Sequence, residues 1–101
     1  MSSDGHTASI FPNQMDLFDS NRLYEVAEHP ESGQKRITVT GKVINHAHHI
    51  IFLVTGSAKA RLVKQILHNE YEAKKYPASL VKNNKGKLSW FLDKEAGKYL
   101  K

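Results

Sequence analysis

Two side chains capable of acid–base chemistry stand together near the start of the chain, in the sequence Asp4-Gly5-His6. A carboxylate two residues before a histidine can fix the imidazole tautomer or hold charge beside the ring, and the intervening glycine permits the unusual dihedrals that this requires. An imidazole held in this way can serve as a general base near neutral pH. The same residues also suit an ordinary turn, because Asp-Gly is a common turn pair and Asp4 could cap a following helix.

A second candidate site follows the apolar run at 50–54, where Gly56, Ser57 and Lys59 form a glycine turn at the start of a helix. Open α/β sheets bind ligands at the carboxyl ends of their strands. The free N–H groups of a first helical turn attract an anion, and Lys59 adds a point charge that suits phosphate. In the alternative interpretation, Ser57 only caps the helix and Lys59 is solvated.

Three histidines cluster at His46, His48 and His49, and a metal site could recruit His29 or His68 as further ligands. Neither carboxylate nor cysteine accompanies them at ligand spacing, so we expect no metal site there. The histidines would then simply end a helix and begin a strand.

A strand–turn–helix unit is the main element expected to position the glycine turn. The continuous apolar run at 50–54 predicts a strand buried on both faces, as in a parallel sheet flanked by helices. The apolar spacing that follows predicts a helix from Ser57 to about His68. Alternation predicts further strands at 23–27 and 36–40.

The remaining stretches are expected to be short, and Trp90 and Phe91 are expected to lie in the core. They comprise a helical or irregular segment at 6–11, a loop at 13–21, a short helix at 42–48, a turn at 83–86, a strand at 87–92 and a closing helix capped by Asp93.

Composition limits the classes of protein to consider. The 101 residues suit a single domain, 1–101, and 40% hydrophobic with 25% charged residues is typical of a soluble, folded chain. The apolar runs are too short to cross a membrane, and the polar start does not resemble a secretory signal, so we expect a cytoplasmic protein. The chain has no cysteine, which excludes disulfides and thiolate sites. The net charge of +5 raises the question of nucleic acid, but the late lysines lack the interleaved arginines and aromatic residues of such a surface.

Several stretches, in this order, resemble one known family. They are the string SDGHTASIFP at 3–12, RITVT at 36–40, VIN at 43–45, FLVTG at 52–56 with Lys59-Ala60, YPAS at 76–79 and WFLD at 90–93. Together they are similar to the C-terminal part of the lactonase branch of the glucosamine-6-phosphate isomerase/6-phosphogluconolactonase family. Members of the isomerase branch usually continue the shared Asp-Gly-His with Ile-Ala-Phe-Asn-Glu, whereas this chain continues with Thr7-Ala8-Ser9, so the lactonase branch is preferred.

The resemblance implies an α/β fold, here the C-terminal part of an open, mainly parallel Rossmann-like sheet flanked by helices. It also implies hydrolysis of 6-phosphoglucono-1,5-lactone, a small sugar-phosphate lactone, in the oxidative pentose phosphate pathway and without a cofactor. His6 matches the family's general base and Asp4 would orient it. Lys59 matches the phosphate-binding lysine, beside Gly56 and Ser57, and Arg36 would be a second cation near the phosphate.

The family usually has a glycine-rich strand end before the position of Asp4, whereas this chain starts at Met1. We therefore expect an N-terminal part of the same enzyme to be missing, and little or no lactonase activity from this chain alone. A deaminase or isomerase of amino-sugar phosphates and a sugar-phosphate-binding remnant without catalysis are the alternatives.

Overall fold

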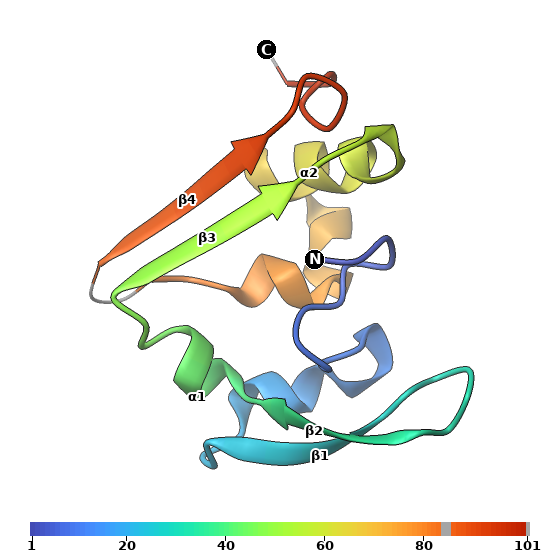
Figure 1. The fold of residues 1–101 in the computed structure, drawn as a ribbon, viewed down its shortest axis with the longest axis vertical. Helices are drawn as coiled ribbons and strands as arrows, with labels where there is room; N and C mark the ends of the chain where they lie inside the picture. Colours follow the sequence, from blue (N-terminus) through green and yellow to red (C-terminus); the bar gives the residue numbers. More distant parts are fainter. Residues whose placement is uncertain (84–85, 101) are drawn as a thin grey trace.

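The computed structural model describes residues 1–83 and 86–100, and Figure 1 shows their arrangement. Its central feature is a parallel pair of strands, β3 (His49–Val54) and β4 (Lys87–Leu92), in register from His49↔Lys87 to Val54↔Leu92. Both strands were predicted from the sequence, β4 with the same bounds, and the prediction is confirmed. The expected turn at 83–86 lies partly outside the described residues.

One face of this pair is covered by α2 (Ala60–Leu67), which follows the short 3-10 turn η2 (Ser57–Lys59) and lies behind the strands in Figure 1. Phe52, Val54 and Val63 are buried there in one hydrophobic cluster. Trp90 joins the cluster from β4, with its ring stacked on Phe52 at a centroid distance of 4.1 Å. The predicted strand–turn–helix unit is therefore present.

The opposite face of the pair is open. Ile51, Leu53 and Phe91 are 55%, 72% and 57% exposed. The prediction that the strand at 50–54 is buried on both faces is thus wrong for this structure, as is the core position of Phe91. The described residues supply a helical layer on the α2 side, and the alternate side chains of each strand point away from it.

A separate antiparallel hairpin joins β1 (Tyr24–Glu28) to β2 (Lys35–Val39), paired from Tyr24↔Val39 to Glu28↔Lys35. In the turn, His29 N–H donates to the Gln34 carbonyl at 2.9 Å, and Gly33 N–H donates to the His29 carbonyl at 2.9 Å. The two predicted strands are confirmed, each displaced by one residue. The helix expected at 42–48 is present but shorter, as α1 (Gly41–Ile44).

Three further 3-10 segments were not predicted: η1 (Pro12–Asp19), η3 (Tyr71–Lys75) and η4 (Pro77–Leu80). The loop expected at 13–21 is wrong because Pro12 starts η1 with its φ already fixed for a helical turn, and the buried Phe18 anchors the segment in the core.

The segment at 6–11, expected to be helical or irregular, is irregular: it forms turns and an isolated antiparallel bridge between Thr7 and Ile10. The expected closing helix is not found within the described residues. After β4 the chain forms successive turns up to residue 100, although Asp93 does accept a cap-like hydrogen bond from Ala96 N–H at 2.8 Å. The Asp93 carboxylate also binds Gly56 N–H, so part of its bonding capacity goes to a residue outside the turn.

Candidate active site

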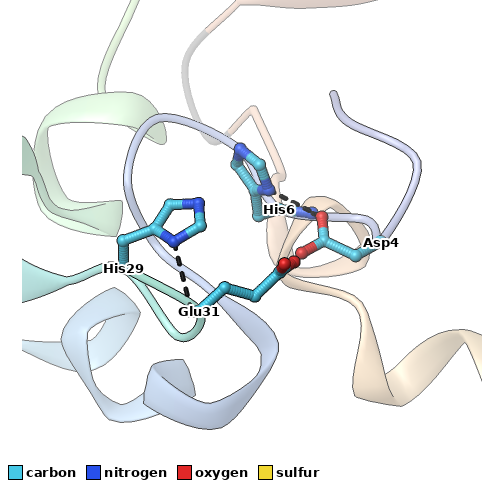
Figure 2. A network of polar contacts seen from close by, with 4 residues as sticks. All are labelled: Asp4, His6, His29 and Glu31. Atoms are coloured by element: carbon cyan, nitrogen blue, oxygen red, sulfur yellow. Dashed lines mark hydrogen bonds and ion pairs between the residues drawn. The ribbon is translucent and has the colours of Figure 1, made fainter. Parts of the chain in front are cut away.

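The Asp4-Gly5-His6 segment folds into a turn that brings its two functional side chains into contact. Asp4 Oδ1 accepts a hydrogen bond from His6 N–H at 3.0 Å and lies 2.6 Å from His6 Nδ1 (Figure 2). Because a carboxylate only accepts, this contact assigns the imidazole proton to Nδ1 and leaves the lone pair on Nε2. The His6 side chain is about a quarter exposed, so the ring is held in place and a small molecule can still reach it.

The turn is held from two sides. Gly5 adopts φ +85°, and a Cβ built there would lie 2.6 Å from the Cβ of Tyr76, so only glycine fits between Asp4 and His6. Ala78 N–H donates to the Gly5 carbonyl at 3.0 Å, which ties the turn to η4. Ser2 N–H donates to the His6 carbonyl at 3.0 Å from the other side. The contacts of Tyr76 and Ala78 with Gly5 were not predicted, because they link segments about seventy residues apart.

His6 packs on Phe11, with ring centroids 4.7 Å apart, and Phe11 is only 1% exposed. Two other side chains, Arg36 and His29, also contact the Phe11 ring. The Arg36 guanidinium carbon is 6.0 Å from the Phe11 centroid, and the His29 ring meets Phe11 edge-on at 5.2 Å. The structure therefore places Arg36 and the candidate base against the same aromatic ring. His29 was considered in the sequence only as an extra metal ligand, and its neighbour Pro30 marked it only as the end of a strand.

The glycine turn after β3 has a different set of contacts. Gly56 adopts φ +86°, and its N–H donates to both carboxylate oxygens of Asp93 at 3.1 Å. That amide is consequently occupied, and Ser57 makes no side-chain cap of the helix. Asp93 is a residue of this turn that the sequence did not indicate, because it lies 37 positions away.

Lys59 lies near the amino end of the chain rather than on Phe11. Burial, and secondarily the charge of Lys59, lowers the pKa of the Met1 amino group below its usual value. Since Ser2 is hydrogen-bonded to both Gly5 and His6, the lysine belongs to the surroundings of the histidine turn. Arg36 and Lys59 come from different elements, β2 and η2.

The histidines at 46, 48 and 49 do not gather with other ligands in the described residues. His46 Nδ1 lies 2.6 Å from the carbonyl of Lys42 in α1. Across residues 1–83 and 86–100, no group of three His, Asp or Glu side chains is placed to hold a metal ion. Over the same residues, none of the helices has the length and apolar character needed to span a bilayer.

The described residues thus form an α/β unit with an aspartate-oriented histidine on one turn and a lysine-bearing glycine turn after its parallel strand β3. The chain belongs to the family described as glucosamine-6-phosphate isomerases/6-phosphogluconolactonase, whose sequence profile matches residues 1–90. Among curated relatives, it is 46% identical to the 6-phosphogluconolactonase of Aggregatibacter actinomycetemcomitans, over 99% of this chain and 43% of that protein. It is 39% identical to the 6-phosphogluconolactonase of Homo sapiens, over 96% of this chain and 38% of that protein.

Solved structures agree with the predicted fold class. A crystal structure named devB protein matches with a TM-score of 0.89 and 42% identity, over 99% of this chain and 42% of that chain. The 6-phosphogluconolactonase of Trypanosoma brucei matches with a TM-score of 0.73 and 31% identity, over all of this chain and 40% of that one. The α/β, Rossmann-like class is confirmed, and the chain spans about two fifths of the length of these relatives.

Proposed function

We propose that this chain carries the general base of a 6-phosphogluconolactonase, which hydrolyses 6-phosphoglucono-1,5-lactone to 6-phosphogluconate. The observation that supports this most directly is the 2.6 Å contact between Asp4 Oδ1 and His6 Nδ1, which leaves His6 Nε2 as the basic atom. The membership of the family and the names of the relatives supply the substrate.

In the proposed reaction, His6 Nε2 takes a proton from a water molecule while the water oxygen attacks the lactone carbonyl carbon. The bond between that carbon and the ring oxygen then breaks, and the imidazolium returns the proton to the ring oxygen as it leaves. Asp4 stabilises the imidazolium between the two steps, so one histidine serves as base and then as acid. A lactone is an activated ester, and a positioned base is a sufficient catalyst for its hydrolysis without a cofactor.

We assign the substrate phosphate to the basic groups around the turn, namely Lys59 and Arg36, with Gly56 and Ser57 shaping the first of these sites. Because the Gly56 amide is bonded to Asp93, this turn would contribute through Lys59 and its remaining groups rather than through that N–H. Replacing Lys59 or Arg36 by alanine should raise KM for the phosphorylated lactone more than it lowers kcat.

We further propose that full activity requires a second polypeptide segment, corresponding to the N-terminal part of the relatives. Its support is the exposed apolar side chains on both sheets, which an enzyme of this family would be expected to cover. They are Ile51, Leu53 and Phe91 on the parallel pair and Tyr24, Val26 and Ile37 on the hairpin. The cytoplasmic location expected from the sequence is part of the same proposal.

The test is a lactone-hydrolysis assay with spontaneous opening subtracted, on the chain alone and co-expressed with the N-terminal part of a close relative. His6→Ala should abolish whatever activity is found, and His68→Ala, at an exposed histidine outside the site, should leave it unchanged. Equal rates for the parent chain and His6→Ala, both above spontaneous opening, would contradict the assignment of the base. Ammonia release from glucosamine 6-phosphate, in place of lactone hydrolysis, would move the chain to the other branch of the family.

A further inference from the structure

His29 has its ring orientation and its tautomer fixed by the hairpin turn. Its Nδ1 accepts hydrogen bonds from the N–H groups of Glu31 and Ser32, both at 3.2 Å, and Figure 2 shows the first of these. An imidazole nitrogen that accepts two amide protons carries no proton itself, so the neutral ring bears its proton on Nε2. Within the part of the chain that the structure describes, this Nε2–H donor has no hydrogen-bond partner.

The donor is held on the same buried ring as the candidate base. Phe11 contacts His6 at 4.7 Å and His29 at 5.2 Å, with an interplanar angle of 71° to the latter. In Figure 2 the Nε2 side of His29 is turned away from the Glu31 turn, on the side where His6 lies. Since Phe11 is buried in the core, both imidazoles rest against one fixed ring.

Arg36 brings a positive charge to the same Phe11 ring. It stands directly across the hairpin from Ala27, two residues before His29, and its guanidinium lies over Phe11. Its Nε–H donates to Gln34 Oε1 at 3.0 Å, which orients the guanidinium and leaves the two Nη groups for another acceptor. A neutral N–H donor beside an oriented guanidinium is an arrangement suited to an anionic oxygen.

We propose that His29 is a substrate-binding residue, whose Nε2–H donates to the same phosphate group that Arg36 holds. The ligand class is a phosphate monoester on a sugar whose reacting carbon lies at His6. This inference rests on the proposed function, because it takes the site around His6 as the active site. It assigns to His29 the selection of phosphorylated over unphosphorylated substrate, a role separate from the chemistry at His6.

Two variants separate this role from the structural role of His29 in the turn. His29→Ala removes both ring nitrogens. His29→Asn keeps an oxygen that can accept from the Glu31 and Ser32 amides, as asparagine does in Asx turns, but places no donor at the Nε2 position. His68→Asn is the matched control, at an exposed histidine of the same chain.

The experiment titrates 6-phosphogluconate and, in parallel, gluconate into the chain, with the imidazole nitrogens followed by NMR. We expect 6-phosphogluconate, but not gluconate, to shift the Nε2 resonance of His29. The dissociation constant for 6-phosphogluconate should rise about tenfold in His29→Asn and His29→Ala, the effect of one hydrogen bond to a charged oxygen, and stay constant in His68→Asn.

The possible failures are distinct. A dissociation constant within twofold of the parent in His29→Asn overturns the role of His29, and an equal response to gluconate overturns the assignment to phosphate. In the hydrolysis assay His29→Asn should raise KM with little change in kcat, whereas His6→Ala should remove kcat. If His6→Ala retains kcat while His29→Asn weakens binding, the proposed base fails and the binding role of His29 stands. If 6-phosphogluconate binds neither the chain alone nor the chain co-expressed with the N-terminal part of a close relative, the binding role of His29 and Arg36 is overturned.

Discussion

The substitution Gly5→Ala tests how the histidine turn is built. Gly5 adopts φ +85°, and an added Cβ would approach three atoms of Tyr76, at 2.6, 2.7 and 2.8 Å. The nearest of these is the Cβ of Tyr76, which can move only with its backbone. The substitution must therefore displace either the turn or the start of η4, to which the turn is tied by the bond from Ala78 N–H to the Gly5 carbonyl.

The loss of stability in Gly5→Ala has two parts, the cost of a positive φ and the overlap with Tyr76, and a second glycine, Gly56, separates them. Gly56 has nearly the same φ, +86°, but a Cβ there meets nothing within 4 Å. Gly56→Ala should therefore show the conformational cost alone, about 1–3 kcal/mol. Gly5→Ala should add the overlap with Tyr76, on the order of 1–3 kcal/mol for an overpacked site.

Urea unfolding followed by the fluorescence of Trp90 measures both variants. With an m-value of about 1–3 kcal/mol/M, the Gly5→Ala midpoint should fall below that of Gly56→Ala by about 1 M, at unchanged m. The His6–Asp4 contact should also be lost, which the His6 imidazole resonances would report. If Gly5→Ala is no less stable than Gly56→Ala, Tyr76 does not hold the turn as described.

Three further predictions concern the same site. Asp4→Asn should lower kcat of lactone hydrolysis by about a hundredfold or more with little change in thermal stability, because the exposed carboxylate fixes the tautomer of His6 but contributes little packing; an unchanged pH–rate profile and rate would argue against it. Asp93→Ala should destabilise the chain by about 1–2 kcal/mol relative to the neighbouring exposed control Lys94→Ala, since Gly56 and Ala96 each lose a hydrogen-bond acceptor; urea midpoints of the two variants compare them. Burial, with the charge of Lys59, lowers the pKa of the Met1 amine in the folded chain, so the unfolded chain binds more protons between that lowered pKa and the usual value of 8.0. The free energy of unfolding should therefore rise with pH across this window. A chain with a formylated Met1 amine should show no such rise in its urea unfolding midpoints.

The parts of the fold that the sequence predicted are those with a local cause. The strands at 24–28, 35–39 and 87–92 follow from alternation and β-branched residues, and the helix after Gly56 follows from its apolar spacing. The Asp4–His6 contact was also accessible, because two residues separate the side chains and Gly5 allows the turn. The continuous apolar run at 50–54 could not reveal which of its faces would be covered, because periodicity carries no information on neighbouring layers.

The parts that were missed depend on contacts between distant segments. Tyr76 packs against Gly5, and Asp93 accepts a hydrogen bond from Gly56. His29 contacts Phe11, although η1 and β1 separate the two residues in the sequence. Each of these residues has an ordinary local role in a turn or at a strand end, so its sequence context gave no sign of the second role. The 3-10 segment η1 was missed for a related reason, since its anchor, Phe18, is recognisable only once the core is known.

The contacts that orient His6 all come from within this chain, whereas the apolar faces left open lie on the two sheets. Ser2, Asp4 and Phe11 contact His6 directly, and Tyr76 and Ala78 hold Gly5. The base should therefore be in place before any covering segment is added, and a low rate in the chain alone should reflect weak substrate binding. Acylation of His6 by diethyl pyrocarbonate compares the two states directly. If the base is preformed, the rate of His6 modification should depend on pH in the same way with and without the covering segment. A pH dependence that changes when the segment is added would mean that the Asp4–His6 pair forms only in the complex.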